Sequence, residues 1–294
     1  MAILNETIEQ ALNHYSDLTA NEFKADVFSF VGGIRPEYIS SFRTHMETLA
    51  NREDKSKNLV FFLYTPGGVV EVVEKMVDII RHYYKEVWFV VPDMAMSAGT
   101  ILCMSGDKIY MDYSSSLGPI DPQIPNSDGH LVPALGYLDQ VEKMIKKSED
   151  GILTDAEFAI LQNQDLATLR RYEQARDLSI SLLKDWLVRY KFKDWNTHSS
   201  NGKKVTENEK SDRAIEIAKS LSDHKLWHSH GRMISIKTLT NDLRLRVEDY
   251  TDDKGLKSVI RQYSDLLLDC VQSRGVDHMF HIKGYHILTD DRGV

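Results

Sequence analysis

The sequence predicts an α/β protein with a core of repeated β–α units and a largely helical C-terminal half. Short apolar runs alternate with segments of helical periodicity up to about residue 113. This alternation is typical of right-handed crossovers in a mostly parallel sheet. After Asp112 helical patterns dominate. We therefore expect an N-terminal helix in residues 1–20, an α/β core in residues 21–150 and a helical region in residues 151–294.

Four near-continuous apolar runs are expected to be strands that helices cover on both faces. They are residues 27–31, 59–64, 87–91 and 108–111. The helices expected before and between them are residues 5–18, 36–49, 69–84 and 97–104. The helix at 69–84 is the clearest, because its apolar residues recur at helical spacing and charged residues fill the other side.

After Asp112, the sequence predicts three helical segments and two loops. The helical segments are residues 133–147, 155–190 and 256–273. Residues 114–126 are rich in Pro, Gly and Ser, which favours an ordered loop. Residues 196–211 are very polar and predict an exposed loop within the C-terminal region.

Composition narrows the class of protein. The 294 residues are 42% apolar and 27% charged, as in soluble globular proteins, and the net charge is −8. So acidic a chain argues against nucleic acid or an anionic membrane as main partner, because both require clustered Lys and Arg. The polar N-terminus is unlike a signal peptide, and no apolar run approaches the ~18 residues of a membrane span. Cys103 and Cys270 lie in apolar runs and are expected to be buried thiols of a cytoplasmic protein.

Two short motifs lie between expected strands and the helices that follow them. The first, Thr65-Pro66-Gly67-Gly68, follows the strand at 59–64 and precedes the helix at 69–84. Two consecutive glycines allow the backbone to approach a ligand closely and to point N–H groups outward. A tight strand-to-helix turn is the alternative interpretation.

The second motif, Ala95-Met96-Ser97-Ala98-Gly99-Thr100, follows the strand at 87–91. Ser97 falls at the start of a helix, where the positive end of the helix lies beneath its hydroxyl. Alternatively, Ser97 is simply a helix N-cap. Both motifs lie at the carboxyl ends of neighbouring parallel strands, where α/β folds bind ligands. Together they predict a nucleophile beside backbone donors for an oxyanion.

The run TPGG, followed by MSAGTILCMSGDKIYMDYSSSLGPIDPQ, resembles the serine dehydrogenase proteinase family. That family is related to signal peptide peptidase A and, more distantly, to the Clp protease proteolytic subunit and the crotonase fold. The resemblance is strongest over about residues 24–145. It implies a Clp/crotonase-like core and a serine endopeptidase-like hydrolase that cleaves peptide or protein substrates without a cofactor. Relatives of this fold form rings, so it also implies a homo-oligomer of three chains or a multiple of three.

The resemblance also implies roles for individual residues. By position, Ser97 corresponds to the nucleophile of the family. The amides of Gly68 and Ala98 correspond to the oxyanion hole, and Gly67 supports it.

The general base departs from the Clp pattern, because residues 118–123 contain no His. Peptidases similar to signal peptide peptidase A use a Lys instead, and three lysines of one expected helix fall in the corresponding range: Lys143, Lys146 and Lys147. Lys143 is preferred because it lies within the helix and the other two lie at its end. The alternatives are His130, or Asp121 acting through a water.

Three histidines raise the question of a metal: His224, His228 and His230. Their spacing is looser than that of zinc motifs and no Cys is near, so we expect no metal site.

Two other functions remain open on the sequence alone. A crotonase-like acyl-CoA enzyme would use the same oxyanion geometry without Ser97, and it would need a basic or adenine-binding pocket that the sequence does not show. A catalytically silent oligomeric scaffold would use Ser97 only as a cap.

Overall fold

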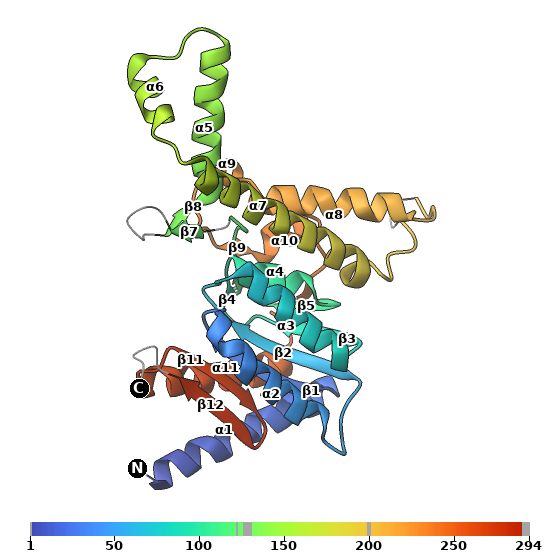
Figure 1. Cartoon of the computed structure of the whole chain (residues 1–294). Helices are drawn as coiled ribbons and strands as arrows, with labels where there is room; N and C mark the ends of the chain where they lie inside the picture. The colour runs from blue at the N-terminus through green and yellow to red at the C-terminus, as the bar shows by residue number, and fades with distance from the viewer. Residues whose placement is uncertain (1, 122, 126–130, 199–200, 290–294) are drawn as a thin grey trace.

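A seven-stranded sheet runs through the protein in the order β10-β5-β3-β2-β1-β11-β12. The computed structural model describes residues 2–121, 123–125, 131–198 and 201–289 (Figure 1). Five neighbouring strands are parallel: β1 (Asp26–Gly32), β2 (Asn58–Tyr64), β3 (Glu86–Val90), β5 (Lys108–Met111) and β10 (Glu248–Asp249). At the β1 side, β11 (His278–Ile282) and β12 (Tyr285–Thr289) add an antiparallel hairpin.

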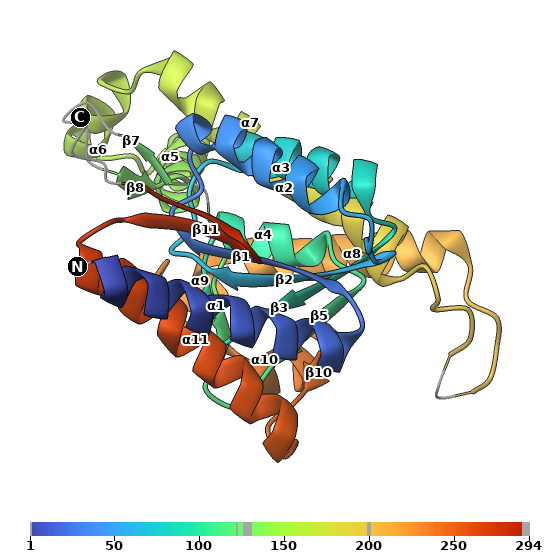
Figure 2. The same cartoon turned by 90° about the horizontal axis from the view of Figure 1, so that it is seen from below.

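Helices cover both faces of this sheet (Figure 2). One face packs against α2 (Ile39–Ala50), α3 (Val70–Tyr83) and α4 (Ala98–Met104), and the other against α1 (Ala2–Phe23) and α11 (Lys254–Arg274). Side chains alternate between the two faces along each strand. Along β2, for example, Phe61 and Leu63 join the first core, whereas Val60 and Phe62 join the second.

The remaining elements surround this layered core. The short strands are β4 (Met94–Ala95), β6 (Ser116–Leu117), β7 (Gln123–Pro125), β8 (Leu131–Pro133) and β9 (Ile234–Ser235). The remaining α-helices are α5 (Ala134–Glu149), α6 (Asp155–Gln162), α7 (Leu166–Trp186), α8 (Glu207–Ser222), α9 (His224–Trp227) and α10 (Ile236–Asn241). The short helix η1 (Pro36–Tyr38) leads into α2, and the π-helix η2 (Leu187–Lys191) continues α7.

The expected β–α alternation of residues 27–111 is confirmed. The ends of its strands and helices differ from expectation by one residue at most, except that the helix expected from residue 36 begins as η1 and becomes α2 only at Ile39. The helix expected at residues 5–18 is longer, from Ala2 to Phe23. Both cysteines are buried free thiols, as predicted.

The structure differs from expectation in the helical segment at 155–190, which is divided into α6, α7 and η2. The cause of the first division is local: the Asp165 carboxylate accepts hydrogen bonds from the amides of Ala167 and Thr168 and so begins a new helix. The polar loop ends earlier than residue 211, because Thr206 and Glu209 form a capping box that begins α8.

The sequence prediction also missed strands after residue 113. The hairpin of β11 and β12 extends the sheet beyond β1, and β6 and β7 lie inside the segment expected to be loop. The hairpin depends on pairing across more than 200 residues, because Phe30 of β1 pairs with Phe280 of β11. β6 likewise pairs with segments distant in the sequence, β4 and β9.

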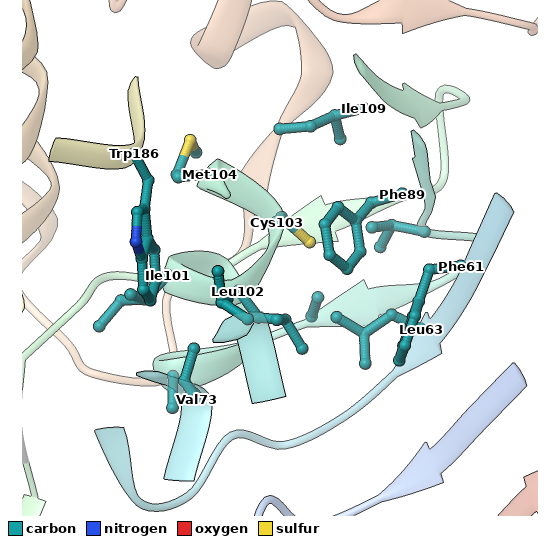
Figure 3. Packing of buried hydrophobic residues seen from close by; sticks show 14 of the residues in the cluster. Phe61, Leu63, Val73, Phe89, Ile101, Leu102, Cys103, Met104, Ile109 and Trp186 are labelled. Atoms are coloured by element: carbon teal, nitrogen blue, oxygen red, sulfur yellow. The ribbon is translucent and has the colours of Figure 1, made fainter. Parts of the chain in front are cut away.

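Helix α4 is the most deeply buried helix in the first core. All seven of its residues are buried, and Figure 3 shows its side chains between Phe89 of β3 and Trp186 of α7. A helix held on every side has one position, so the residue at its N-terminal end is fixed as well.

Candidate active site

Ser97 stands at the N-terminal end of α4 in a strained backbone conformation. Its φ is 52° and its ψ is −115°, a region that residues with a side chain seldom occupy. Such a conformation costs about 1–3 kcal/mol and persists where the surrounding structure enforces it. The Ser97 side chain makes no capping hydrogen bond to α4. The N-cap interpretation therefore explains the position of this serine but not its conformation.

The turn that contains Gly67 packs directly against Ser97. Backbone hydrogen bonds join the two segments, from the Thr65 amide to the Met94 carbonyl (3.1 Å) and from the Met96 amide to the Thr65 carbonyl (3.0 Å). A β-carbon at Gly67 would lie 2.9 Å from the Ser97 β-carbon, and the φ of Gly67 is +104°. Only glycine fits there, and the two motifs singled out in the sequence adjoin in the structure.

Gly68 and Ala98 offer two backbone donors beside Ser97. Gly68 forms a parallel bridge with Ile34, in which the hydrogen bonds come from the amides of Ile34 and Val69. Among the residues that the structure describes, the amide nitrogens of Gly68 and Ala98 have no hydrogen-bond acceptor. Ala98 is the first residue of α4, where backbone N–H groups have no partner within the helix. Both N–H groups are therefore available to a negatively charged oxygen.

A small sheet brings a third segment to the same place. β6 runs parallel to β4, and β9 runs antiparallel to β6. Three segments therefore lie at the same end of this small sheet: Ser97 just after β4, the residues after β6 and the residues before β9. The Thr100 hydroxyl in α4 strengthens this arrangement, because it accepts a hydrogen bond from the Gly118 amide (2.9 Å) and lies 2.8 Å from the Gly118 carbonyl oxygen.

Asp121 lies buried beyond this edge, with a 4% exposed side chain. Its carboxylate accepts a hydrogen bond from the Leu135 amide in the first turn of α5 (3.1 Å). Asp121 therefore orients the start of α5.

Lys143 is not placed beside Ser97 by any contact within the described chain. Figure 1 shows α5 extending away from the layers that contain α4. The Lys143 side chain is 54% exposed, and its ammonium pairs with Asp139 at 2.7 Å. Lys147 pairs with Glu157. His130 lies outside the described residues.

A cavity of about 410 Å³ opens between the first turn of α5, the residues after β6 and the segment before β9. Its walls include Pro119, Asp121, Gly136, Trp227, His228 and His230. Sequence reasoning examined these histidines only for a metal and missed the cavity. In the described part of the chain, no group of three or more His, Cys, Asp or Glu side chains is arranged to hold a metal ion.

Cys103 does not compete with Ser97 as a nucleophile. It is completely buried in α4, and this burial raises the pKa of its thiol. A thiol that stays protonated in an apolar core is inert.

A family model described as a ClpP-like, SDH-type serine proteinase matches residues 48–221, which is more than half of the chain. The chain belongs to this family. Membership confirms the family and the Clp-type α/β fold expected from the sequence, and it supports a serine peptidase-like hydrolase.

Two uncharacterized proteins of Methanocaldococcus jannaschii are similar to parts of this family member. The first is 31% identical over 132 residues, which are 45% of this chain and 41% of that protein. The second is 32% identical over 72 residues, 24% of each chain. The chain thus matches less than half the length of these curated relatives.

Two solved structures of a membrane-bound stomatin-specific protease align with 78% of this chain at a TM-score of 0.45. One mutant form is 13% identical and is covered over 79% of its length. A second mutant form, in complex with a substrate peptide, is 15% identical and is covered over 75%. In the family member described here, no helix in the described ranges is long and apolar enough to cross a bilayer.

Proposed function

We propose that this protein hydrolyses peptide bonds with Ser97 as nucleophile and the amides of Gly68 and Ala98 as oxyanion hole. The observation that carries the proposal is the conformation of Ser97. It is held at a positive φ, without a capping bond, against Gly67 and beside two backbone amides that have no acceptor among the described residues. Strain of this kind is concentrated at active sites, where the surrounding structure enforces it.

In the proposed reaction, the Ser97 hydroxyl oxygen attacks the scissile carbonyl carbon and its proton passes to a general base. The carbonyl oxygen becomes an oxyanion that accepts hydrogen bonds from the Gly68 and Ala98 amides. The base then returns the proton to the leaving amine, and water hydrolyses the acyl-enzyme. Removal of one such donor typically costs about 10²–10³ in turnover.

We propose Lys143 as the base, on the resemblance to peptidases with a Ser-Lys pair. A lysine accepts a proton near neutral pH only when burial lowers its pKa. Since Lys143 is exposed and paired with Asp139 in the single chain, the proposal requires a neighbouring copy to cover this part of α5.

An assembly of three chains, or a multiple of three, is accordingly part of the proposal. Its support is a group of apolar side chains exposed on α5, α6 and the turn between them: Ile145, Ile152, Phe158 and Ile160. Figure 1 shows these helices projecting from the body of the protein. Monomeric proteins rarely expose large apolar patches. We also propose a cytoplasmic location, in keeping with the two buried free thiols.

A fluorophosphonate probe, which reacts with activated serines, tests the nucleophile. We expect labelling of the wild-type protein and of Ser258→Ala, a surface control on α11, and no labelling of Ser97→Ala with an unchanged circular dichroism spectrum. Undiminished labelling of Ser97→Ala would show that the nucleophile is another residue. No labelling of the wild type would favour the catalytically silent scaffold.

The acyl-CoA alternative is tested by the same samples. Such an enzyme needs a basic pocket for the nucleotide of coenzyme A, and the described walls of the 410 Å³ cavity contain no Lys or Arg. Binding of coenzyme A by calorimetry, without probe labelling, would favour that alternative.

A further inference from the structure

The cavity beyond Ser97 has a position and a chemistry that the proposed reaction does not use. Gly118 connects it to the nucleophile: a β-carbon on Gly118 would lie 3.1 Å from the Met96 α-carbon, one residue before Ser97. Pro119, the next residue, is part of the cavity wall. Ser97 itself is not among the described wall residues. The cavity therefore adjoins the site of bond cleavage without containing it.

An extended peptide bound at Ser97 can reach this cavity. Successive residues of an extended chain advance about 3.3 Å, and their side chains point alternately to opposite sides. A substrate residue one to three positions from the scissile bond therefore brings its side chain to a cavity next to the nucleophile. The volume of about 410 Å³ is large enough for a long side chain.

The polar side chains of the described cavity wall belong to Asp121, His228, Ser229 and His230. Among the described wall residues, Asp121 is the only one with a formal charge at neutral pH when the histidines are neutral. Burial lowers the pKa of His230, which favours the neutral imidazole with one acceptor nitrogen. The formal charge of the described wall is therefore negative, which favours a cationic ligand.

Trp227 provides the apolar part of the wall. Its indole is held in place because Nε1 donates a hydrogen bond to the Ser220 carbonyl (2.7 Å), and its side chain is largely buried. A fixed indole packs against a methylene chain and attracts a cation to its face. Lysine and arginine side chains combine a methylene chain with a cationic end group that only donates hydrogen bonds.

We propose that this cavity is a substrate subsite that selects a lysine or arginine side chain near the scissile bond, with Asp121 as the charge that recognises it. The proposal rests on the proposed peptidase function of Ser97. It adds a substrate class to that function, namely proteins cleaved near a basic residue.

The test uses alanine-based peptides as competitors of the fluorophosphonate probe, which itself carries no amino-acid side chain. It measures the peptide concentration that protects Ser97 from labelling. Each peptide carries one lysine, or one norleucine of similar length without the charge, at one of six positions. At one or two positions we expect the lysine peptide to protect at about tenfold lower concentration than the norleucine peptide. A tenfold gain in affinity is the size expected for one hydrogen bond to a charged group in a partly enclosed site.

Two variants locate the effect. Asp121→Asn keeps an oxygen that accepts the Leu135 amide but removes the charge, so lysine and norleucine should become equal within about twofold. Gly136→Leu places a side chain where a β-carbon meets no atom within 4 Å, so it should fill the cavity and abolish the preference without disturbing α5. Glu142→Gln removes an exposed charge from the same helix outside the cavity wall and should keep the preference.

The outcomes separate the two proposals. If the probe labels Ser97 but lysine and norleucine protect equally at all six positions, the subsite is overturned and the proposed function stands. A lysine preference that survives both Asp121→Asn and Gly136→Leu also overturns it. If no probe labels Ser97, the proposed function fails and the subsite fails with it.

Discussion

Gly68 lies so close to Ile34 that a β-carbon at position 68 would stand 2.0 Å from the Ile34 carbonyl oxygen. The bridge between these two residues, which ends with the Val69 amide donating to the Ile34 carbonyl at 2.9 Å, sets the direction of the Gly68 amide beside Ser97. The proposed oxyanion donor is therefore positioned by the chain that follows β1 as well as by its own turn.

Gly68→Ala should therefore damage both stability and chemistry. The new β-carbon must displace the Ile34 backbone, at a φ of +150° that disfavours any side chain, so we expect a loss of at least about 1–3 kcal/mol in the free energy of unfolding. Probe labelling should fall by about 10²–10³. Urea unfolding and labelling rates measure the two effects. Gly255→Ala on α11, where a β-carbon meets only Asp253 Oδ1 at 3.6 Å, is the control and should be harmless. Wild-type labelling of Gly68→Ala would contradict the oxyanion assignment.

Lys143→Ala tests the proposed base. If Lys143 takes the proton of Ser97, its removal should slow fluorophosphonate labelling by about 10²–10⁴, the usual contribution of general base catalysis. Lys147→Ala removes a lysine from the end of the same helix, where it pairs with Glu157, and should label at the wild-type rate. Equal rates for Lys143→Ala and the wild type would direct the search for the base to Asp121 or His130.

Phe158→Asp tests the assembly. The Phe158 side chain is 51% exposed on α6 in the single chain, and a buried charge in an interface is strongly unfavourable. Light scattering should give the mass of three chains, or a multiple of three, for the wild type and a smaller assembly for the variant. Because Lys143 is proposed to act as base only when a neighbouring copy buries it, fluorophosphonate labelling of Ser97 should fall as the assembly is lost. A single-chain mass for the wild type at micromolar concentration would contradict the proposal.

His281 should make stability depend on pH. Burial, and to a smaller extent the nearby His286 and His45, lower its pKa from 6.5 to about 3. As the pH falls, His281 is therefore protonated near pH 6.5 in the unfolded chain, but only near pH 3 in the folded protein. The stabilising contribution is complete above pH 6.5 and is lost as the pH falls toward 3.

Between pH 7 and pH 5 the free energy of unfolding should fall by about 2 kcal/mol through this group. Denaturant unfolding at the two pH values measures the loss. In His281→Gln the pH dependence should be weaker, whereas His82→Gln, on the surface of α3, should retain the wild-type dependence. An identical pH dependence in His281→Gln and the wild type would show that other groups are responsible.

Much of the core could be predicted from sequence because its signals are local. The apolar runs of β1, β2, β3 and β5 and the periodicity of α3 each lie within one short segment. The capping signals at Asp165 and Thr206 were equally local, and attention to them would have corrected the helix boundaries. No local signal predicted the hairpin of β11 and β12, because its position depends on pairing with β1 from the other end of the chain.

By itself, the sequence determined which residues could supply the chemistry: a serine at the start of a helix, a pair of glycines after the preceding strand, and the family to which these motifs point. The tertiary structure alone decided their geometry. Whether Ser97 caps its helix or stands strained against Gly67 depends on the fully buried α4 and on the backbone hydrogen bonds between the two motifs. The cavity at Asp121 joins segments from β6, α5 and the chain before β9, and Lys143 is exposed because α5 projects from the body. A short motif can be recognised from residues that are neighbours in the sequence. The backbone strain of Ser97, the exposure of Lys143 and the charge in the cavity depend on how distant segments pack.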